Sequence, residues 1–80
     1  MQDPGVLGRI NDLAHEEEDL YAKAGHGELG NADRERLRVI QIELDQCSDL
    51  LHQRRARRSG GLYPEDAKVR PPEVVEGYEA

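Results

Sequence analysis

Apolar residues recur along the first part of the chain at alternating spacings of four and three, the period of a helix that packs along one side. The positions are Val6, Ile10, Leu13, Glu17, Leu20 and Ala24, with the acidic Glu17 as the one interruption. Pro4 follows Asp3, which is a good helix start because proline at the first helical position gives up no hydrogen bond. The pattern predicts a helix over residues 3–24.

A second stretch repeats this pattern after a glycine-rich interval. Its positions are Leu37, Ile40, Leu44, Cys47, Leu51, Arg54 and Arg58. Asn31 and Asp33 are both suitable caps for its start, and Ser59-Gly60-Gly61 is a typical helix end. The pattern predicts a second helix over residues 31–59, with the turn in 25–30.

Two such helices, joined by a short turn, bury their apolar sides by folding back on each other. The predicted fold class is all-α, with residues 1–59 forming an antiparallel two-helix hairpin that resembles a coiled coil. The turn is expected to place Ala24 near Leu37. Counting back from that pair brings Leu13 beside Cys47.

The remaining residues, 60–80, differ in composition because they contain three prolines and an excess of acids. Proline removes a backbone donor and disfavours helix at the residue before it. We therefore predict a mostly irregular tail in which Pro64 and Pro72 each open one helical turn. Val75 and Tyr78 are spaced to share a face of the second turn.

Each predicted helix also carries apolar residues outside its packing stripe. They are Leu7, Ala14 and Tyr21 on the first helix, and Val39, Ile42 and Leu50 on the second. An aligned surplus of this kind indicates another layer of structure. Either two hairpins pair into a four-helix dimer, or the tail folds back over these residues. Because a chain of 80 residues has a thin core, we expect a homodimer.

Composition points to a soluble protein in a reducing compartment. Cys47 is the only cysteine, so no disulfide can form within the chain. The first residues lack the basic and apolar regions of a signal peptide, and no apolar run approaches the roughly 20 residues that cross a bilayer. We expect a cytoplasmic protein with no membrane partner.

The strongest concentration of positive charge lies at the end of the second helix. It consists of Arg54, Arg55, Arg57 and Arg58. Guanidinium groups bind phosphate well, but they also pair with a chain's own acids. The net charge of −6 argues against general nucleic-acid binding, and no aromatic residues alternate with the arginines to stack on bases.

Two pairs place a carboxylate and an imidazole one helical turn apart, as in di-iron bundles. They are Asp12 with His15, and Asp49 with His52. Counting from the apolar stripes directs both pairs to the outer surface, so we predict no metal site and no cofactor. No nucleophile, base and orienting group converge, and two helices enclose no pocket, so we predict no enzyme.

Glu17 occupies an apolar stripe, where a carboxylate is costly to bury without a partner. It either turns to the edge and meets water, or pairs across a dimer interface and sets its register. Cys47 is expected to act as a small packing residue, because no basic neighbour on its face would activate the thiol.

Several stretches resemble one family. They are Leu44 to Arg58, Arg9-Ile10-Asn11-Asp12-Leu13 with Glu16-Glu17, Val69-Arg70-Pro71, and Val75-Glu76-Gly77-Tyr78. Over nearly the whole chain they resemble short actinobacterial proteins grouped as domain of unknown function 2630. Members share the Glu-Gly-Tyr tail and often carry Trp where this chain has Ser48, a departure that removes apolar area. The resemblance implies a bacterial, cytoplasmic setting and no particular activity.

The leading interpretation is a noncatalytic protein–protein interaction module of the bacterial cytoplasm, which dimerises and binds a protein partner that the sequence does not identify. A regulator of a larger enzyme would be a special case of it. The alternative is a nucleic-acid-associated accessory protein that acts through the arginines. The candidate interaction residues are Arg54, Arg55, Arg57, Arg58, Leu7, Tyr21, Val39, Ile42, Leu50 and Tyr78.

Overall fold

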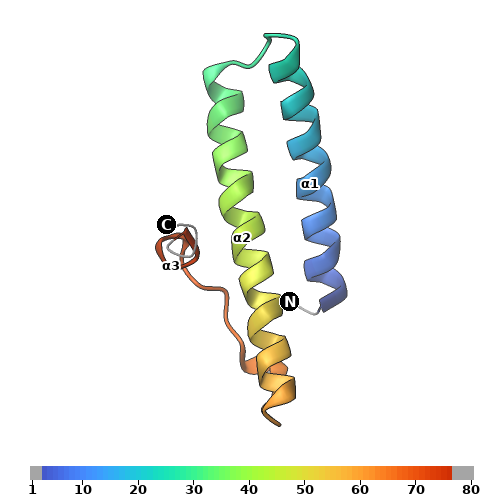
Figure 1. Ribbon diagram of the computed structural model, residues 1–80, viewed down its shortest axis with the longest axis vertical. Helices are drawn as coiled ribbons and strands as arrows, with labels where there is room; N and C mark the ends of the chain where they lie inside the picture. The colour runs from blue at the N-terminus through green and yellow to red at the C-terminus, as the bar shows by residue number, and fades with distance from the viewer. Residues whose placement is uncertain (1–2, 77–80) are drawn as a thin grey trace.

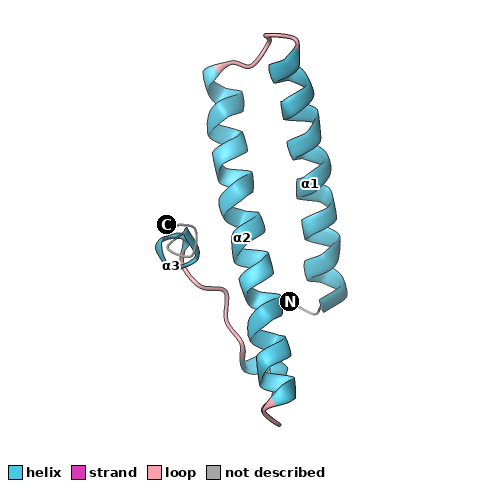
Figure 2. Cartoon of the chain, viewed as in Figure 1, coloured by secondary structure: helices cyan, strands magenta, loops and turns pink. Residues whose placement is uncertain are grey.

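The computed structural model describes residues 3–76, which form two long antiparallel helices and a tail that returns along the second (Figure 1). The elements are α1 (Asp3–Gly25), α2 (Asn31–Ser59), the 3₁₀ helix η1 (Pro64–Asp66) and α3 (Pro72–Glu76). The predicted all-α hairpin is confirmed, and both long helices end within one residue of the predicted limits. Within residues 3–76 the cartoon is helix and loop throughout (Figure 2).

Both long helices bury one row of their apolar stripe completely and the other row only in part. The buried row consists of Val6, Leu13 and Leu20 in α1, and of Ile40, Cys47 and Arg54 in α2. The half-buried row contains Ile10, Glu17, Leu37, Leu44 and Leu51. The contact between the two helices is therefore closer to the buried row than to the half-buried row.

The register differs by about one helical turn from the predicted one. Leu13 packs in a cluster with Ile40 and Leu44, whereas Cys47 belongs to a second cluster with Val6. Leu13 is therefore level with Leu44, and the predicted contact between Leu13 and Cys47 is wrong.

The loop between the helices explains the shift. The prediction placed Ala24 against Leu37, but Ala24 is exposed and Leu29 of the loop packs against that cluster instead. Lys23 Nζ then lies 2.7 Å from Asp33 Oδ2, which joins the end of α1 to the start of α2. A loop residue thus fills the position that the helical period assigned to α1.

The two helix ends use glycine as predicted. Gly27 adopts a φ of 73° and Gly61 a φ of 75°, the left-handed conformation that glycine accepts without steric cost. After α2 the amide of Leu62 donates to the carbonyl of Arg57 at 2.7 Å, which reverses the chain. The tail then runs back along α2 on the side away from α1 (Figure 1).

Two glutamines of α2 hold the tail by its backbone. Gln53 donates to the carbonyl of Lys68 at 2.7 Å, and Gln46 donates to that of Arg70 at 3.1 Å. Ala67 and Val75 are buried. Both single turns predicted at the prolines are present, as η1 and α3.

The hairpin and tail lie side by side and make a plate of 50 × 26 × 15 Å, one helix thick. Most domains bury their core between at least two layers. In this plate no other segment of residues 3–76 forms a further layer over the two broad faces of the hairpin. Within the described range no helix has an apolar stretch long enough to cross a lipid bilayer.

Candidate interaction surface

One broad face of the hairpin is crossed by interhelical ion pairs, and we call it the closed flank. Its pairs are Arg9 with Glu43, Glu16 with Arg36, and Lys23 with Asp33. Arg36 Nη2 donates to Glu16 Oε1 at 2.9 Å. The α1 members recur every seven residues, so they line up along one edge of the helix contact.

Ion pairing on the closed flank shifts the pKa values of its side chains so that their charged forms are favoured. The hydrogen bond from Arg36 lowers the pKa of Glu16, and that from Lys23 lowers the pKa of Asp33. The same contact raises the pKa of Arg36. Glu16, Asp33 and Arg36 are therefore charged at neutral pH, and this face is polar.

The opposite broad face we call the open flank. Its outer residues are Leu7, Ala14 and Tyr21 of α1, and Gln41, Ser48 and Arg55 of α2. Leu7 is 56% exposed and Tyr21 is 51% exposed. One side-chain hydrogen bond crosses this face, from Gln41 Nε2 to the Tyr21 hydroxyl at 3.1 Å.

Beneath these outer residues lies the half-buried row, which is reached through shallow grooves. One groove of about 320 Å³ is lined by Glu17, Gln41, Leu44 and Asp45. Another of about 160 Å³ is lined by Ser48, Leu51, His52 and Arg55. Apolar side chains of the helix contact are thus accessible from the open flank, which is the side facing away from the ion pairs.

The apolar residues outside the packing stripes, which the sequence analysis treated as one group, lie on different sides of the hairpin. Leu7 and Tyr21 lie on the open flank, whereas Leu50 is only 3% exposed because the tail covers it near Ala67. Val39 and Ile42 lie on the outer side of α2, in the same rows as the residues that hold the tail.

The tail alternative foreseen from the sequence is therefore realised for part of that surplus. Val75 is buried, but Val69 and Val74 remain exposed. Tyr78 lies outside the described residues. As far as residue 76, the tail covers the outer side of α2 and does not extend over the open flank.

The four arginines do not form one patch. Arg54 is buried, with Nη1 2.8 Å from Asp3 Oδ1, and Arg58 pairs with the other oxygen of Asp3. These hydrogen bonds, the one from Arg58 first, lower the pKa of Asp3. Arg55 is exposed on the open flank and Arg57 is half-buried. Arg54 therefore lies in the helix contact, as its stripe position predicts, and is not an exposed interaction residue, because its guanidinium pairs with Asp3 at the start of α1.

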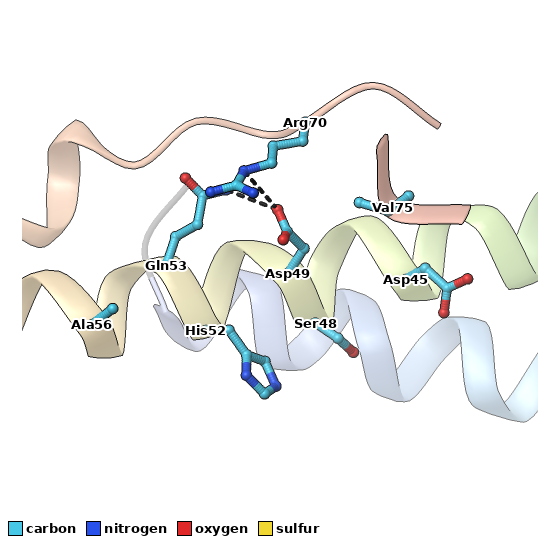
Figure 3. Close-up of a pocket in the computed structure, with 8 residues that line it drawn as sticks. All are labelled: Asp45, Ser48, Asp49, His52, Gln53, Ala56, Arg70 and Val75. Atoms are coloured by element: carbon cyan, nitrogen blue, oxygen red, sulfur yellow. Dashed lines mark hydrogen bonds and ion pairs between the residues drawn. The ribbon is translucent and has the colours of Figure 1, made fainter. Parts of the chain in front are cut away.

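A pocket that the sequence did not predict lies between α2 and the tail (Figure 3). It has a volume of about 440 Å³ and is lined by Asp45, Ser48, Asp49, His52, Gln53, Ala56, Arg70 and Val75. In Figure 3 Arg70 reaches from the tail to Asp49, with Nε 3.5 Å from Oδ2. The side chain of Asp49 is only 9% exposed. Asp49 therefore lies on the outer face of α2 as predicted, but it is not exposed to solvent there, because the tail covers it.

Cys47, a residue of the buried row, packs in one cluster with Val6 and Leu50. Burial raises the pKa of its thiol. A protonated thiol is a weak nucleophile, so the arrangement agrees with the predicted packing role. Among residues 3–76, no three His, Cys, Asp or Glu side chains come together as a set of metal ligands.

The chain is similar to uncharacterized proteins of Mycobacterium tuberculosis strain H37Rv and of Mycobacterium bovis. Each is 49% identical over 77 residues, which cover 95% of this chain and 88% of the relative. No solved structure gives a significant match. The model of the family described as "Protein of unknown function (DUF2630)" matches residues 2–80, so the chain belongs to that family.

Proposed function

We propose that this protein is a noncatalytic protein–protein interaction module of the bacterial cytoplasm, and that its binding surface is the open flank. The observation that carries the proposal is the difference between the two broad faces of a plate one helix thick. Ion pairs cross one face, while the other leaves Leu7 and Tyr21 more than half exposed above a half-buried leucine row.

The open flank has the composition of an interface centre. Leucine and tyrosine supply apolar area, and polar side chains such as Gln41 and Arg55 border it. Aligned apolar residues on a monomer commonly mark a site of protein contact, and tyrosine is frequent among residues that dominate binding energy.

Nucleic-acid binding has less support. Arg54 and Arg58 both pair with Asp3. Arg55 and Arg57 would have to supply the phosphate contacts in a chain whose net charge is −6. The interaction module is therefore the function that the arrangement favours, and salt-dependent binding to DNA or RNA is the observation that would favour the alternative.

Site-specific photo-crosslinking in the native cell tests the proposal. A photoreactive phenylalanine analogue replaces Tyr21 in one variant and Val39 in a matched control, since Val39 is also exposed but lies on the outer side of α2. We expect a discrete protein adduct from position 21 and none from position 39. The absence of any adduct at position 21, or equal adducts at both positions, would overturn the proposal.

A further inference from the structure

We infer that the open flank binds a second copy of this chain, giving a four-helix dimer whose two-fold axis runs along the helices. In this dimer α1 of each copy lies against α2 of the other at the same height. The inference rests on the proposed function, because it names the partner of the same surface. Three observations support it: the size of the face, the charges of the helices and the alignment of apolar residues.

The face is large enough for a stable dimer. α1 contains 23 residues, and at a rise of about 1.5 Å per residue it is about 35 Å long. Two neighbouring helices give a width of about 20 Å, so the open flank offers about 700 Å² per copy. Stable protein interfaces bury about 600–1,000 Å² per partner, and the open flank falls within this range. The second copy would also supply the missing layer over the half-buried row.

Charge decides how the two copies are oriented. α1 contains six acidic and two basic residues, whereas α2 contains five acidic and seven basic residues. A two-fold axis across the helices would pack α1 on α1 and so place like charges together. An axis along the helices packs the acidic α1 on the basic α2 and so places opposite charges together.

The apolar residues then meet in matched layers. Within one copy Leu13 is level with Leu44, and this axis keeps the heights of both copies equal. Each outer residue of α1 therefore faces a half-buried leucine of the second copy. The pairs are Leu7 with Leu51, Ala14 with Leu44, and Tyr21 with Leu37.

One charge pair at the rim distinguishes this orientation. Glu18 and Arg38 are level with each other, and their side chains are 80% and 65% exposed. The contacts that the structure shows for them are local, to His15 and Glu35 one turn away. In the dimer Glu18 of one copy faces Arg38 of the other, and the symmetry produces this contact twice.

Sedimentation of the full chain at micromolar concentration tests for the dimer. Leu7→Glu and Tyr21→Glu should each weaken association by at least roughly a hundredfold, since both place a charge inside the interface. Val39→Glu is the matched control and should leave the dimer unchanged. Far-ultraviolet circular dichroism of every variant establishes that the hairpin is folded. A wild-type chain that is monomeric throughout, or equal loss of dimer in the control, overturns the inference.

Charge exchange tests the orientation. Glu18→Arg and Arg38→Glu should each weaken the dimer by roughly tenfold, and the double variant should recover the wild-type affinity. Additive losses in the double variant would overturn the orientation. Crosslinking separates this inference from the proposed function: an adduct of position 21 with a different protein, together with a monomeric chain, overturns the dimer and leaves the interaction module standing.

Discussion

The two flanks of the hairpin are built from the same pair of helices, yet they differ in what holds the helices together. On the closed flank, charged side chains reach across the contact and pair. On the open flank, apolar side chains of the contact stay accessible through grooves lined by residues such as Leu44 and Leu51. Covering a face whose charged groups are already paired within the chain would gain little free energy. An apolar face of the same molecule still gains from burial.

The largest expected effect is on the free energy of unfolding, which should depend strongly on the buried row and little on the open flank. Leu13 is 1% exposed and Leu7 is 56% exposed. Leu13→Ala should lower the free energy of unfolding by about 2–5 kcal/mol, because it leaves a cavity between the helices. Leu7→Ala should change the stability of the dilute chain by less than about 0.5 kcal/mol. Urea unfolding followed by circular dichroism measures both, and equal losses would contradict the proposed difference.

An intermediate effect concerns the one acid in the half-buried row. Glu17 lines a groove of the open flank with Gln41 and Leu44. In the dimer the two copies of Glu17 come close to the axis, where like charges repel, so Glu17→Leu should tighten self-association by roughly tenfold. Asp12→Leu serves as a control, because Asp12 is exposed on the outer side of α1, away from the open flank. Sedimentation over a concentration series gives the two affinities, and weaker association of Glu17→Leu would argue against burial of this residue.

The smallest effect belongs to the closed flank and depends on pH. The pKa values of Glu16 and Asp33 are lowered in the folded chain from ordinary values of 4.5 and 3.8. A lowered folded pKa means that the unfolded chain binds protons first, so the stabilisation is complete above these ordinary values. It is lost as the pH falls through them toward the folded values.

Thermal unfolding between pH 6 and pH 3 measures this loss, as a melting temperature that decreases on the acid side of about pH 4.5. Glu16→Gln should reduce the slope, since it removes one of the titrating groups. An unchanged slope in that variant would show that other carboxylates account for the acid sensitivity.

The hairpin itself was predictable because its signals are local. Each helix is predicted from the spacing of its own apolar residues, and the turn is predicted from the glycine cluster alone. The register was not predictable from that period, since a shift of one turn keeps apolar residues opposite one another. What decides it is Leu29, a loop residue outside both stripes, together with the pairing of Lys23 with Asp33.

The difference between the flanks did leave a signal in the sequence, although apolar positions alone do not reveal it. Arg9, Glu16 and Lys23 recur every seven residues with alternating sign, and Arg36 and Glu43 do the same on α2. Such series are typical of charged residues that flank a helix contact.

The docking of the tail also has a signal in the sequence, because Gln46 and Gln53 of α2, which bind the tail, are seven residues apart. The ion pair between Arg70 and Asp49 left no such signal, because Arg70 lies outside any helix and no helical period relates it to Asp49. The position of the pocket therefore required the folded chain.

The ion pairs of Asp3 affect how the start of α1 and the end of α2 separate from each other. Its carboxylate joins the first turn of α1 to Arg54, 51 residues later, and to Arg58 one turn beyond. Helix ends normally fray, but here each end restrains the other, so both should separate in a single event. Amide hydrogens of the second turn of α1, the first that donate within the helix, should then exchange with solvent about as slowly as those at its middle.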